Sequence, residues 1–243
     1  MLRLYPDPGT IELTDAYGDL ALAGLAPADR PYVIVNMVQT ADGQARIGDD
    51  TAELGNEADA RLFARLREQV DCVMAGTRTI AIENYNAPAR GDDVRERRVG
   101  NGLAPRPLFA TISRSGVLPL AAPLFQDEGM EIVVFGESEQ KLSDLPAAVT
   151  RVPETSPVVV LSSLRHRFGV RSLLLEGGPR INAPMFAAGV IDELFLTVAP
   201  VLAGADTPFP IVAGSLPRRR RLGLAGALLD EDHLFLRYRV DVD

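Results

Sequence analysis

Short apolar segments rich in β-branched residues recur along the chain and alternate with segments of helical periodicity. Residues 32–38 read Tyr-Val-Ile-Val-Asn-Met-Val, and a run of this length and composition is typical of a buried strand. Comparable runs occupy 72–75, 108–112, 131–135, 172–175 and 194–198. Strands that are apolar along their whole length are typical of a sheet covered on both faces.

Helices are predicted between these strands. From Asn56 to Gln69, apolar residues recur at three- and four-residue spacing with charges between them, as on an amphipathic helix. Residues 158–168 and 179–188 predict two more helices, the second with proline in its first turn. Strands that alternate with helices form mainly parallel sheets. The expected fold class is α/β, with a mostly parallel central sheet and helices on both faces.

Two further features complete the predicted fold. Residues 222–229 and 233–240 flank an acidic turn and predict a C-terminal antiparallel hairpin at the edge of the sheet. Residues 86–105 are rich in Arg, Asp, Gly and Pro and predict a long surface loop. Because the chain shows no internal repeat or linker, we expect a single domain over 31–243. An N-terminal extension over 1–30 precedes it.

The composition excludes several classes of function. The 33 acidic and 25 basic side chains give a formal net charge of −8, whereas a nucleic-acid-binding protein normally carries a basic face. One cysteine, Cys72, and two distant histidines, His166 and His233, cannot build a cysteine-rich zinc site. The single lysine, Lys141, lies in a polar run, which argues against a Schiff base on a desolvated lysine. We expect neither a metal nor a nucleic-acid partner.

The sequence also predicts a cytoplasmic protein without a membrane partner. Residues 1–9 carry prolines and an aspartate where a signal peptide needs an apolar run. No stretch reaches the about 18 consecutive apolar residues of a membrane span.

Polar or glycine-containing turns follow three of the predicted strands. Glu176-Gly177-Gly178-Pro179-Arg180 stands where a strand ends and a helix begins, and the backbone N–H groups of such a junction can bind an anion. Gly76-Thr77-Arg78-Thr79 and Ser113-Arg114 follow two other strands. Taken alone, each is also compatible with a solvated turn, and the G-x-G-x-x-G fingerprint is absent. Together, at the carboxyl ends of strands, they favour a phosphate-rich ligand such as a dinucleotide.

A longer series of motifs resembles a known family. In chain order they are Thr40-Ala41-Asp42-Gly43, Leu66-Arg67 followed by Asp71 and Gly76, the spacing of Thr79, Glu83 and Arg90, Glu176-Gly177-Gly178-Pro179, and Gly189 to Pro200 with Leu202-Ala203-Gly204. Their order and spacing are similar to those of the pyrimidine reductase domain of the bifunctional deaminase-reductase of riboflavin biosynthesis. The likeness runs from about Val33 to Val240 and suggests a stand-alone member. It implies the dihydrofolate-reductase-like fold.

The resemblance implies NADPH as the cofactor and hydride transfer from its nicotinamide. Carried over by position, the backbone around Val38 faces the nicotinamide. The other residues expected to contact the cofactor are Gly76, Thr77, Arg78, Thr79, Glu83, Ser113, Arg114, Gly136, Gly177, Gly178, Pro179, Arg180 and Ile181. Arg78 and Arg114 resemble contacts to the 2′-phosphate, and a guanidinium suits a phosphate dianion.

Catalytic and substrate positions also follow from the resemblance. Asp42 and Glu83 are expected at the catalytic centre, where Asp42 orients a ligand or relays a proton. The alternative for Asp42 is that it caps its own turn. Substrate contacts are expected from Thr51, Arg90 and Glu176; Arg90 either neutralises a substrate phosphate or is a surface charge. We interpret Leu54, Arg61 and Arg67 as packing or surface residues.

The implied reaction is the reduction of 5-amino-6-(5-phosphoribosylamino)uracil, or a related small molecule, to a ribitylamino compound by a homodimer. A dihydrofolate- or pterin-type reductase and a non-catalytic NADP-binding module are the alternatives. A phosphate-handling hydrolase is disfavoured because the chain has no lysine P-loop.

The sequence departs from the family pattern at several positions: the family's aspartate, proline and leucine are Glu83, Tyr85 and Ala87 here, and the chain has no tryptophan. One cysteine cannot supply the deaminase's P-C-x-x-C.

Overall fold

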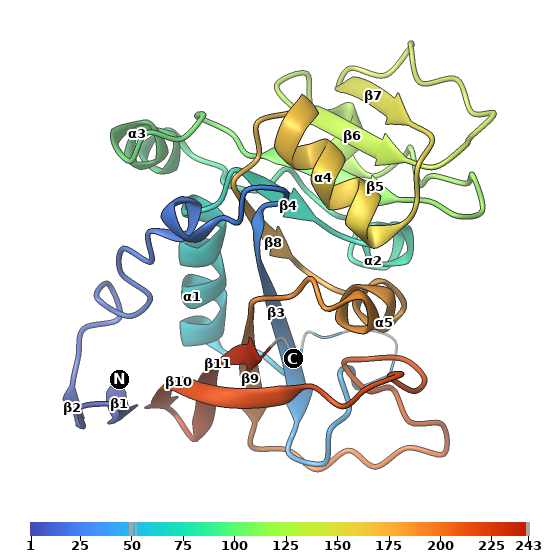
Figure 1. The fold of residues 1–243 in the computed structure, drawn as a ribbon. Helices are drawn as coiled ribbons and strands as arrows, with labels where there is room; N and C mark the ends of the chain where they lie inside the picture. Colours follow the sequence, from blue (N-terminus) through green and yellow to red (C-terminus); the bar gives the residue numbers. More distant parts are fainter. Residues whose placement is uncertain (49–50, 52, 242–243) are drawn as a thin grey trace.

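The computed structural model describes residues 1–48, 51 and 53–241 and arranges them around one eleven-stranded sheet (Figure 1). The strands are β1 (Leu2–Tyr5), β2 (Gly9–Thr10), β3 (Tyr32–Thr40), β4 (Cys72–Met74), β5 (Leu108–Ile112), β6 (Glu131–Phe135), β7 (Ala148–Val152), β8 (Ser172–Leu175), β9 (Glu193–Ala199), β10 (Arg221–Asp230) and β11 (His233–Asp241). Their order across the sheet is β2-β1-β10-β11-β9-β3-β8-β4-β5-β6-β7.

The sheet is parallel from β9 through β3 to β7. Strands β11, β10, β1 and β2 continue it in antiparallel pairing. The predicted mostly parallel sheet with a C-terminal antiparallel hairpin is therefore confirmed. The hairpin is not the edge of the sheet, however, because β1 pairs with β10 and β2 with β1. This pairing could not be predicted from the apolar pattern, because both strands are short and mostly exposed.

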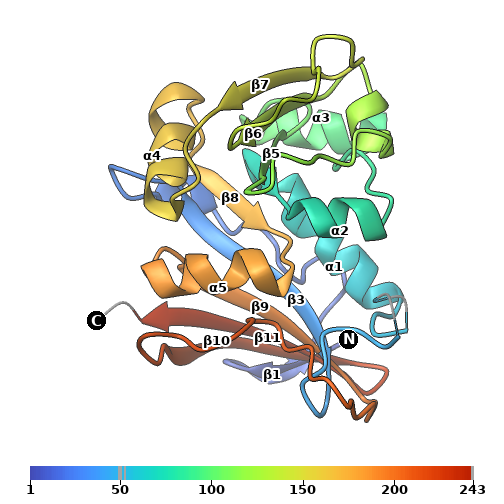
Figure 2. The ribbon, with the colours of Figure 1, turned by 90° about the vertical axis from the view of Figure 1, so that its right-hand side faces the viewer.

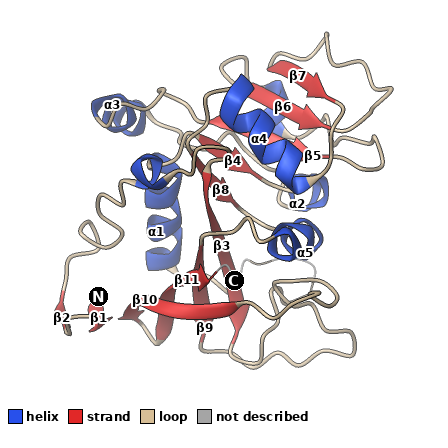
Figure 3. Ribbon diagram, viewed as in Figure 1, coloured by secondary structure: helices blue, strands red, loops and turns tan. Residues whose placement is uncertain are grey.

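Helices cover both faces of the sheet (Figure 3). They are α1 (Glu57–Glu68), α2 (Thr77–Ile82), α3 (Asp92–Gly100), α4 (Pro157–Arg167) and α5 (Pro179–Ala188), with the 3-10 turns η1 (Leu22–Leu25) and η2 (Pro123–Gln126). Figure 2 shows α4 and α5 on one side and α1 and α2 on the other. Of the helices within the described residues, none is long and apolar enough to cross a membrane.

The central strand β3 contributes to the core on both faces. Val33 and Val35 pack in one apolar cluster with residues of α4 and α5, whereas Ile34 packs in a second cluster with α1 and α2. All three side chains are fully buried. This alternation explains why the strand reads as a continuous apolar run in the sequence.

Residues 86–105 were predicted to form a loop, and the structure corrects this prediction. They contain α3, a helix with almost no apolar face, so it carries no periodic signal. Arg98 fixes it instead: this fully buried side chain donates hydrogen bonds to the carbonyls of Arg67 (2.8 Å) and Val70 (2.9 Å). The Arg67 carbonyl belongs to the last turn of α1, where helix carbonyls lack partners within the helix, and the Val70 carbonyl lies just beyond it.

Two other elements were not predicted. Residues 76–79, interpreted as a polar turn, instead cap and begin α2. Strand β7 is mostly exposed at the edge of the sheet, so it lacks the apolar run that reveals the central strands.

Candidate active site

Two adjoining cavities, each of about 620 Å³, lie beyond the carboxyl ends of β4 and β8 and along β3. We call them the α1 cavity, lined by α1 and residues 83–94, and the α2/α5 cavity, lined by the first turns of α2 and α5. The residues that line both are Met37, Ala45, Thr51, Thr79, Glu83 and Glu176. Because the cavities share this wall, two ligands bound in them would meet there.

Two glycine turns that are distant in the sequence form the floor of the α2/α5 cavity. The N–H of Gly76 donates to the carbonyl of Gly177 at 3.2 Å. Gly178 has a φ of +72°, and a Cβ there would stand 2.9 Å from the Thr79 hydroxyl. Glycine thus leaves room for a ligand to approach the backbone at the start of α5.

Four guanidinium groups line the same cavity, and their sequence positions are Arg46, Arg78, Arg114 and Arg180. Arg46 lies over the Phe209 ring, with its central carbon 4.1 Å from the ring centroid. Local cations of this kind can hold a polyanionic ligand despite the net negative charge of the chain.

Most of the predicted cofactor residues line the α2/α5 cavity: Gly76, Thr77, Arg78, Thr79, Glu83, Arg114, Gly178, Pro179, Arg180 and Ile181. Ser113 instead lines a neighbouring hollow that shares Arg114, and its hydroxyl donates to the Val117 carbonyl at 3.1 Å. Gly177 and Gly136 allow the backbone to pack closely against its neighbours. At Gly177, a Cβ would stand 2.5 Å from the Met37 sulfur. At Gly136, it would stand 2.1 Å from the Ser113 carbonyl oxygen.

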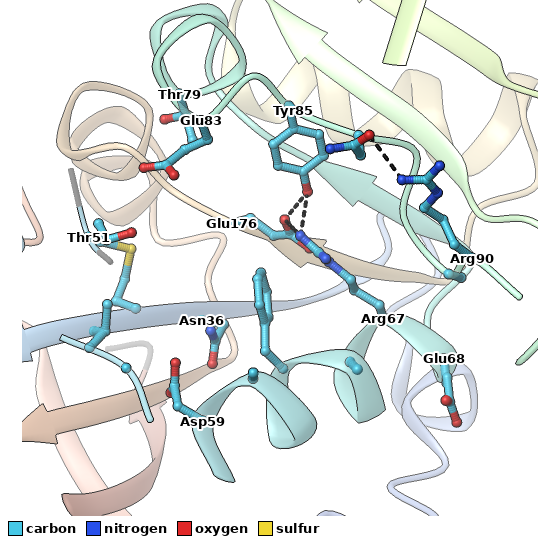
Figure 4. Close-up of a pocket in the computed structure, with 18 of the residues that line it drawn as sticks. Asn36, Thr51, Asp59, Arg67, Glu68, Thr79, Glu83, Tyr85, Arg90 and Glu176 are labelled. Carbon is cyan, nitrogen blue, oxygen red and sulfur yellow. Dashed lines mark hydrogen bonds and ion pairs between the residues drawn. The ribbon is translucent and has the colours of Figure 1, made fainter. Parts of the chain in front are cut away.

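The α1 cavity contains a buried polar cluster at its inner end (Figure 4). Arg67 binds Glu176 through two hydrogen bonds, Nε to Oε1 and Nη2 to Oε2, both of 2.7 Å. The Tyr85 hydroxyl donates to the same carboxylate and accepts from Arg67 at 3.0 Å. The guanidinium also lies 4.0 Å from the centroid of the Phe63 ring. Arg67, Tyr85 and Glu176 therefore each form hydrogen bonds with the other two.

The charges of this cluster stabilise one another. Burial acts to lower the pKa of the Arg67 guanidinium, but the charge and hydrogen bonds of Glu176 outweigh it and raise the pKa. Burial, and then the charge of Glu176, raise the pKa of the Tyr85 phenol well above its ordinary value. At neutral pH, Arg67 is therefore a cation and Tyr85 a neutral donor.

Arg67 corrects the interpretation of the sequence, which assigned it to packing or the surface. The other two residues of that set behave as expected: Leu54 is fully buried and the Arg61 side chain is 62% exposed. Arg67 was missed because its partners Tyr85 and Glu176 lie 18 and 109 residues away. The only available signal was its place in the Leu66-Arg67 motif.

The predicted substrate residues Thr51, Arg90 and Glu176 all line the α1 cavity, as does Val38. Arg90 is exposed and donates to the Asn86 side chain at 3.0 Å. Glu83, one of the two predicted catalytic carboxylates, is exposed at the end of α2 on the wall that both cavities share. Thus Glu83 and these substrate residues lie around connected space.

Asp42 is placed elsewhere. It is not among the described residues that line either cavity. Its carboxylate accepts hydrogen bonds from Thr40 and from the N–H groups of Gly204 (2.7 Å) and Ala203 (3.3 Å). The hydrogen bond from Thr40, and then that from Gly204, lower the pKa of Asp42. Asp42 therefore has a structural contact here: it connects the turn after β3 to residues 203–204.

Among the described residues, no group of three or more His, Cys, Asp or Glu side chains could hold a metal ion.

The sheet order and the paired cavities define a dihydrofolate-reductase-like α/β protein. Residues 31–231 match the RibD C-terminal domain, and the chain belongs to this family.

Curated relatives include two archaeal proteins named 2,5-diamino-6-ribosylamino-4(3H)-pyrimidinone 5′-phosphate reductase. That of Archaeoglobus fulgidus is 29% identical over 188 residues, which cover 74% of this chain and 85% of the relative. That of Methanothermobacter thermautotrophicus is 27% identical, covering 76% and 85%. Among solved structures, a pyrimidine reductase-like protein from Corynebacterium diphtheriae aligns with a TM-score of 0.78 and 21% identity, covering 96% of this chain and 100% of that one. This last likeness concerns the fold.

Proposed function

We propose that the protein is an NADPH-dependent reductase that converts a ribosylamino-pyrimidine 5′-phosphate into its ribitylamino form. The observation that carries this proposal is the pair of adjoining cavities with a shared wall, because hydride transfer needs two ligands in contact. Membership in the RibD C-terminal domain family and the names of the archaeal relatives support the same reaction. They also make the 2,5-diamino pyrimidinone the first substrate to test.

The α2/α5 cavity fits NADPH. The cradle that a Cβ at Gly178 would fill, together with the start of α5, suits a pyrophosphate. Arg78 and Arg114 are exposed guanidinium groups on this cavity and suit a 2′-phosphate, which favours NADPH over NADH. When bound, NADPH supplies a hydride; the chain supplies binding, orientation and charge.

The α1 cavity fits the second ligand. Arg67 and Tyr85 hold the Glu176 side chain in a fixed direction, so its remaining lone pairs can accept from amino groups of a pyrimidine. Arg90, at the outer wall, can neutralise the substrate phosphate. The shared residues Thr79 and Glu83 lie where the sugar and the nicotinamide would meet.

Three further features belong to this proposal. We propose a single reductase domain over 31–243, preceded by the 1–30 extension. A homodimer is supported by the exposed Leu222 and Leu224, which lie on the part of β10 that, within the described residues, β1 does not cover. A cytoplasmic location agrees with the free thiol of Cys72, since thiols stay reduced in that compartment.

The proposal is tested by following NADPH oxidation with the purified protein. We expect turnover with the 2,5-diamino ribosylamino pyrimidinone phosphate or its uracil counterpart, a ribitylamino product by mass spectrometry, and weaker binding of NADH. Turnover of dihydrofolate alone would instead identify a pterin-type reductase. NADPH binding without reduction of any of these compounds would favour a non-catalytic module.

A further inference from the structure

A second carboxyl group lies in the α1 cavity, apart from the Arg67–Glu176 pair. Asp59 belongs to the first turn of α1 and is half-buried. Figure 4 shows it on the α1 side of the cavity. Neither the motifs of the sequence nor the proposed cofactor and substrate contacts use this residue.

Asp59 is held at a fixed place beside the central strand. Its N–H donates to the capping side chain of Asn56 at 2.9 Å. The Thr197 hydroxyl donates to its Oδ1 at 2.6 Å. Thr197 lies on β9, where its register partner on β3 is Val38, the residue expected to face the nicotinamide. The carboxyl group is thus tied to the strand pair that would border the reacting carbon.

The other oxygen of Asp59 is available to a ligand. Among the described residues, none donates a hydrogen bond to Oδ2. This atom lies over Gly55, at 2.7 Å from the position that a Cβ would take, and both residues line the cavity. Glycine at 55 therefore leaves the space in which Oδ2 stands.

The other acidic groups of the cavity are less suited to give up a proton. Glu176 is bound by Arg67, and Glu68 by Arg65 and Arg97. Glu83 is exposed to solvent. The Tyr85 proton is already donated to Glu176. Among the described acidic residues of the cavity, Asp59 alone combines partial burial with an oxygen directed at open space.

The reaction requires a proton as well as a hydride. In the ribosylamino substrate the exocyclic nitrogen forms a double bond to C1′ while the C1′–O4′ bond breaks, and its electron pair goes to O4′. That oxygen needs a proton to become the 4′-hydroxyl of the product. A hydride, which bound NADPH would supply, must then end on C1′, and the electrons of the double bond return to nitrogen. One proton and one hydride therefore balance the reduction.

We propose that Asp59 is the general acid of this reaction and donates its proton to O4′ as the sugar ring opens. The proposal rests on the proposed function. After each turnover, water reprotonates the carboxylate through the open side of the cavity.

The surroundings of Asp59 raise its pKa above that of an exposed aspartate. Burial raises its pKa, against the hydrogen bond from Thr197 and the charge of His233, which both lower it. Tyr17 and His233 lie near it on the packed elements, and the other titratable or charged groups that line the cavity are Arg67, Glu68, Glu83, Tyr85, Arg90 and Glu176. A general acid is most effective when its pKa lies near the working pH.

The first test is Asp59→Asn, which keeps the volume and an acceptor for Thr197 but removes the acidic proton. We expect kcat to fall about 100-fold or more, with little change in KM and in NADPH affinity. Glu57→Gln is the matched control: it removes an exposed carboxylate from the same turn of α1 and should leave activity unchanged.

The pH dependence separates proton donation from a structural role. Because the acid works in its protonated form, wild-type kcat should fall as pH rises through the pKa of Asp59. This descending limb of the pH profile should be absent in Asp59→Asn. In Thr197→Val, the hydrogen bond that lowers the pKa of Asp59 is lost, so the descending limb should move to higher pH.

An infrared titration gives a readout without cofactor or turnover. The difference spectrum between wild type and Asp59→Asn isolates the carboxyl C=O band, and its midpoint should lie above the roughly 3.9 of an exposed aspartate. A midpoint at or below that value, or near-wild-type kcat in Asp59→Asn, overturns the assignment. So does an unchanged descending limb in that variant. If wild type itself reduces no ribosylamino substrate, the proposed function fails and the role of Asp59 with it.

Discussion

Glu176 is a carboxylate whose burial requires a specific cation. Its side chain is 2% exposed, and that of Arg67 is 25% exposed. A carboxylate this deeply buried is unfavourable unless it is paired and hydrogen-bonded. Arg67 reaches it from α1, while Glu176 follows β8, so the pair also connects the helix to the sheet. At the scale of residues, the inner end of the α1 cavity depends on this contact.

Arg67→Met is expected to lower the free energy of unfolding by about 3–5 kcal/mol, because it leaves Glu176 buried without its cation. The double variant Arg67→Met/Glu176→Gln should recover most of this loss, as measured by urea unfolding. Arg61→Met is the matched control, since its partner Glu57 is exposed and the change should stay within about 1 kcal/mol. If Arg67→Met and Arg61→Met lowered the free energy of unfolding equally, the argument for the buried Arg67–Glu176 pair would be contradicted.

The residues of the site differ in how far the sequence could predict them. The glycine turns and arginines of the α2/α5 cavity were predictable, because the carboxyl ends of parallel strands meet at one edge of a sheet. Arg67 and Tyr85 were not, since their roles depend on contacts across many residues of chain. Asp42 shows the limit of a motif position: its carboxylate is bound by Thr40 and by the distant N–H groups of Ala203 and Gly204, and it is not among the described residues that line the two cavities.

At the scale of elements, α3 acts as a clamp on the end of α1. Arg98 donates to the carbonyls of Arg67, Glu68 (3.2 Å) and Val70, and to that of Ala104 (2.9 Å). Burial lowers the pKa of Arg98 to about 10, so the group remains charged at neutral pH. The clamp holds the turn of α1 that carries Arg67, and thereby supports the α1 cavity from behind.

Arg98→Met is expected to destabilise the protein by about 3 kcal/mol, because several buried carbonyls lose a charged donor. It should also weaken substrate binding more than NADPH binding, since α1 borders only the α1 cavity. Arg95→Met on the same helix is the control: it loses only the contact to exposed Asp92 and should change stability by less than about 1 kcal/mol. Urea unfolding and calorimetric titration measure the two effects. Similar losses in both variants would show that the clamp is not specific to Arg98.

Elements with a strong apolar pattern were predicted closely, and those without one were not. The expected helix from Asn56 to Gln69 is α1, and the predicted central strands all occur. The missed helix α3 is polar and is held by a buried arginine rather than by an apolar face. Likewise, β1, β2 and β7 lie towards the two ends of the sheet, where half-exposed backbone needs no continuous apolar run.

At the scale of the whole molecule, the sheet leaves part of one strand open. Within the part of the chain that the structure describes, strand β10 pairs with β11 along its length, whereas β1 covers only its 227–229 portion. Leu222 and Leu224, in the uncovered part, are 44% and 42% exposed. Uncovered strand edges invite pairing with another chain, and a two-fold axis brings the same segment of two copies together. This stretch is therefore the expected contact of the proposed homodimer.

Leu224→Asp is expected to convert the homodimer into a monomer, because it places two carboxylates at a contact that a two-fold axis repeats. Sedimentation velocity at micromolar concentration should show the halved mass, while circular dichroism stays unchanged because the side chain lies outside the buried core. Val117→Asp is the control, since Val117 is 65% exposed in the segment after β5, far from β10 in the sheet order, and this variant should remain dimeric. A wild-type protein that sediments as a monomer would refute the dimer. If wild type and Leu224→Asp are both dimers, the contact lies on another face, and the free stretch of β10 needs a different partner.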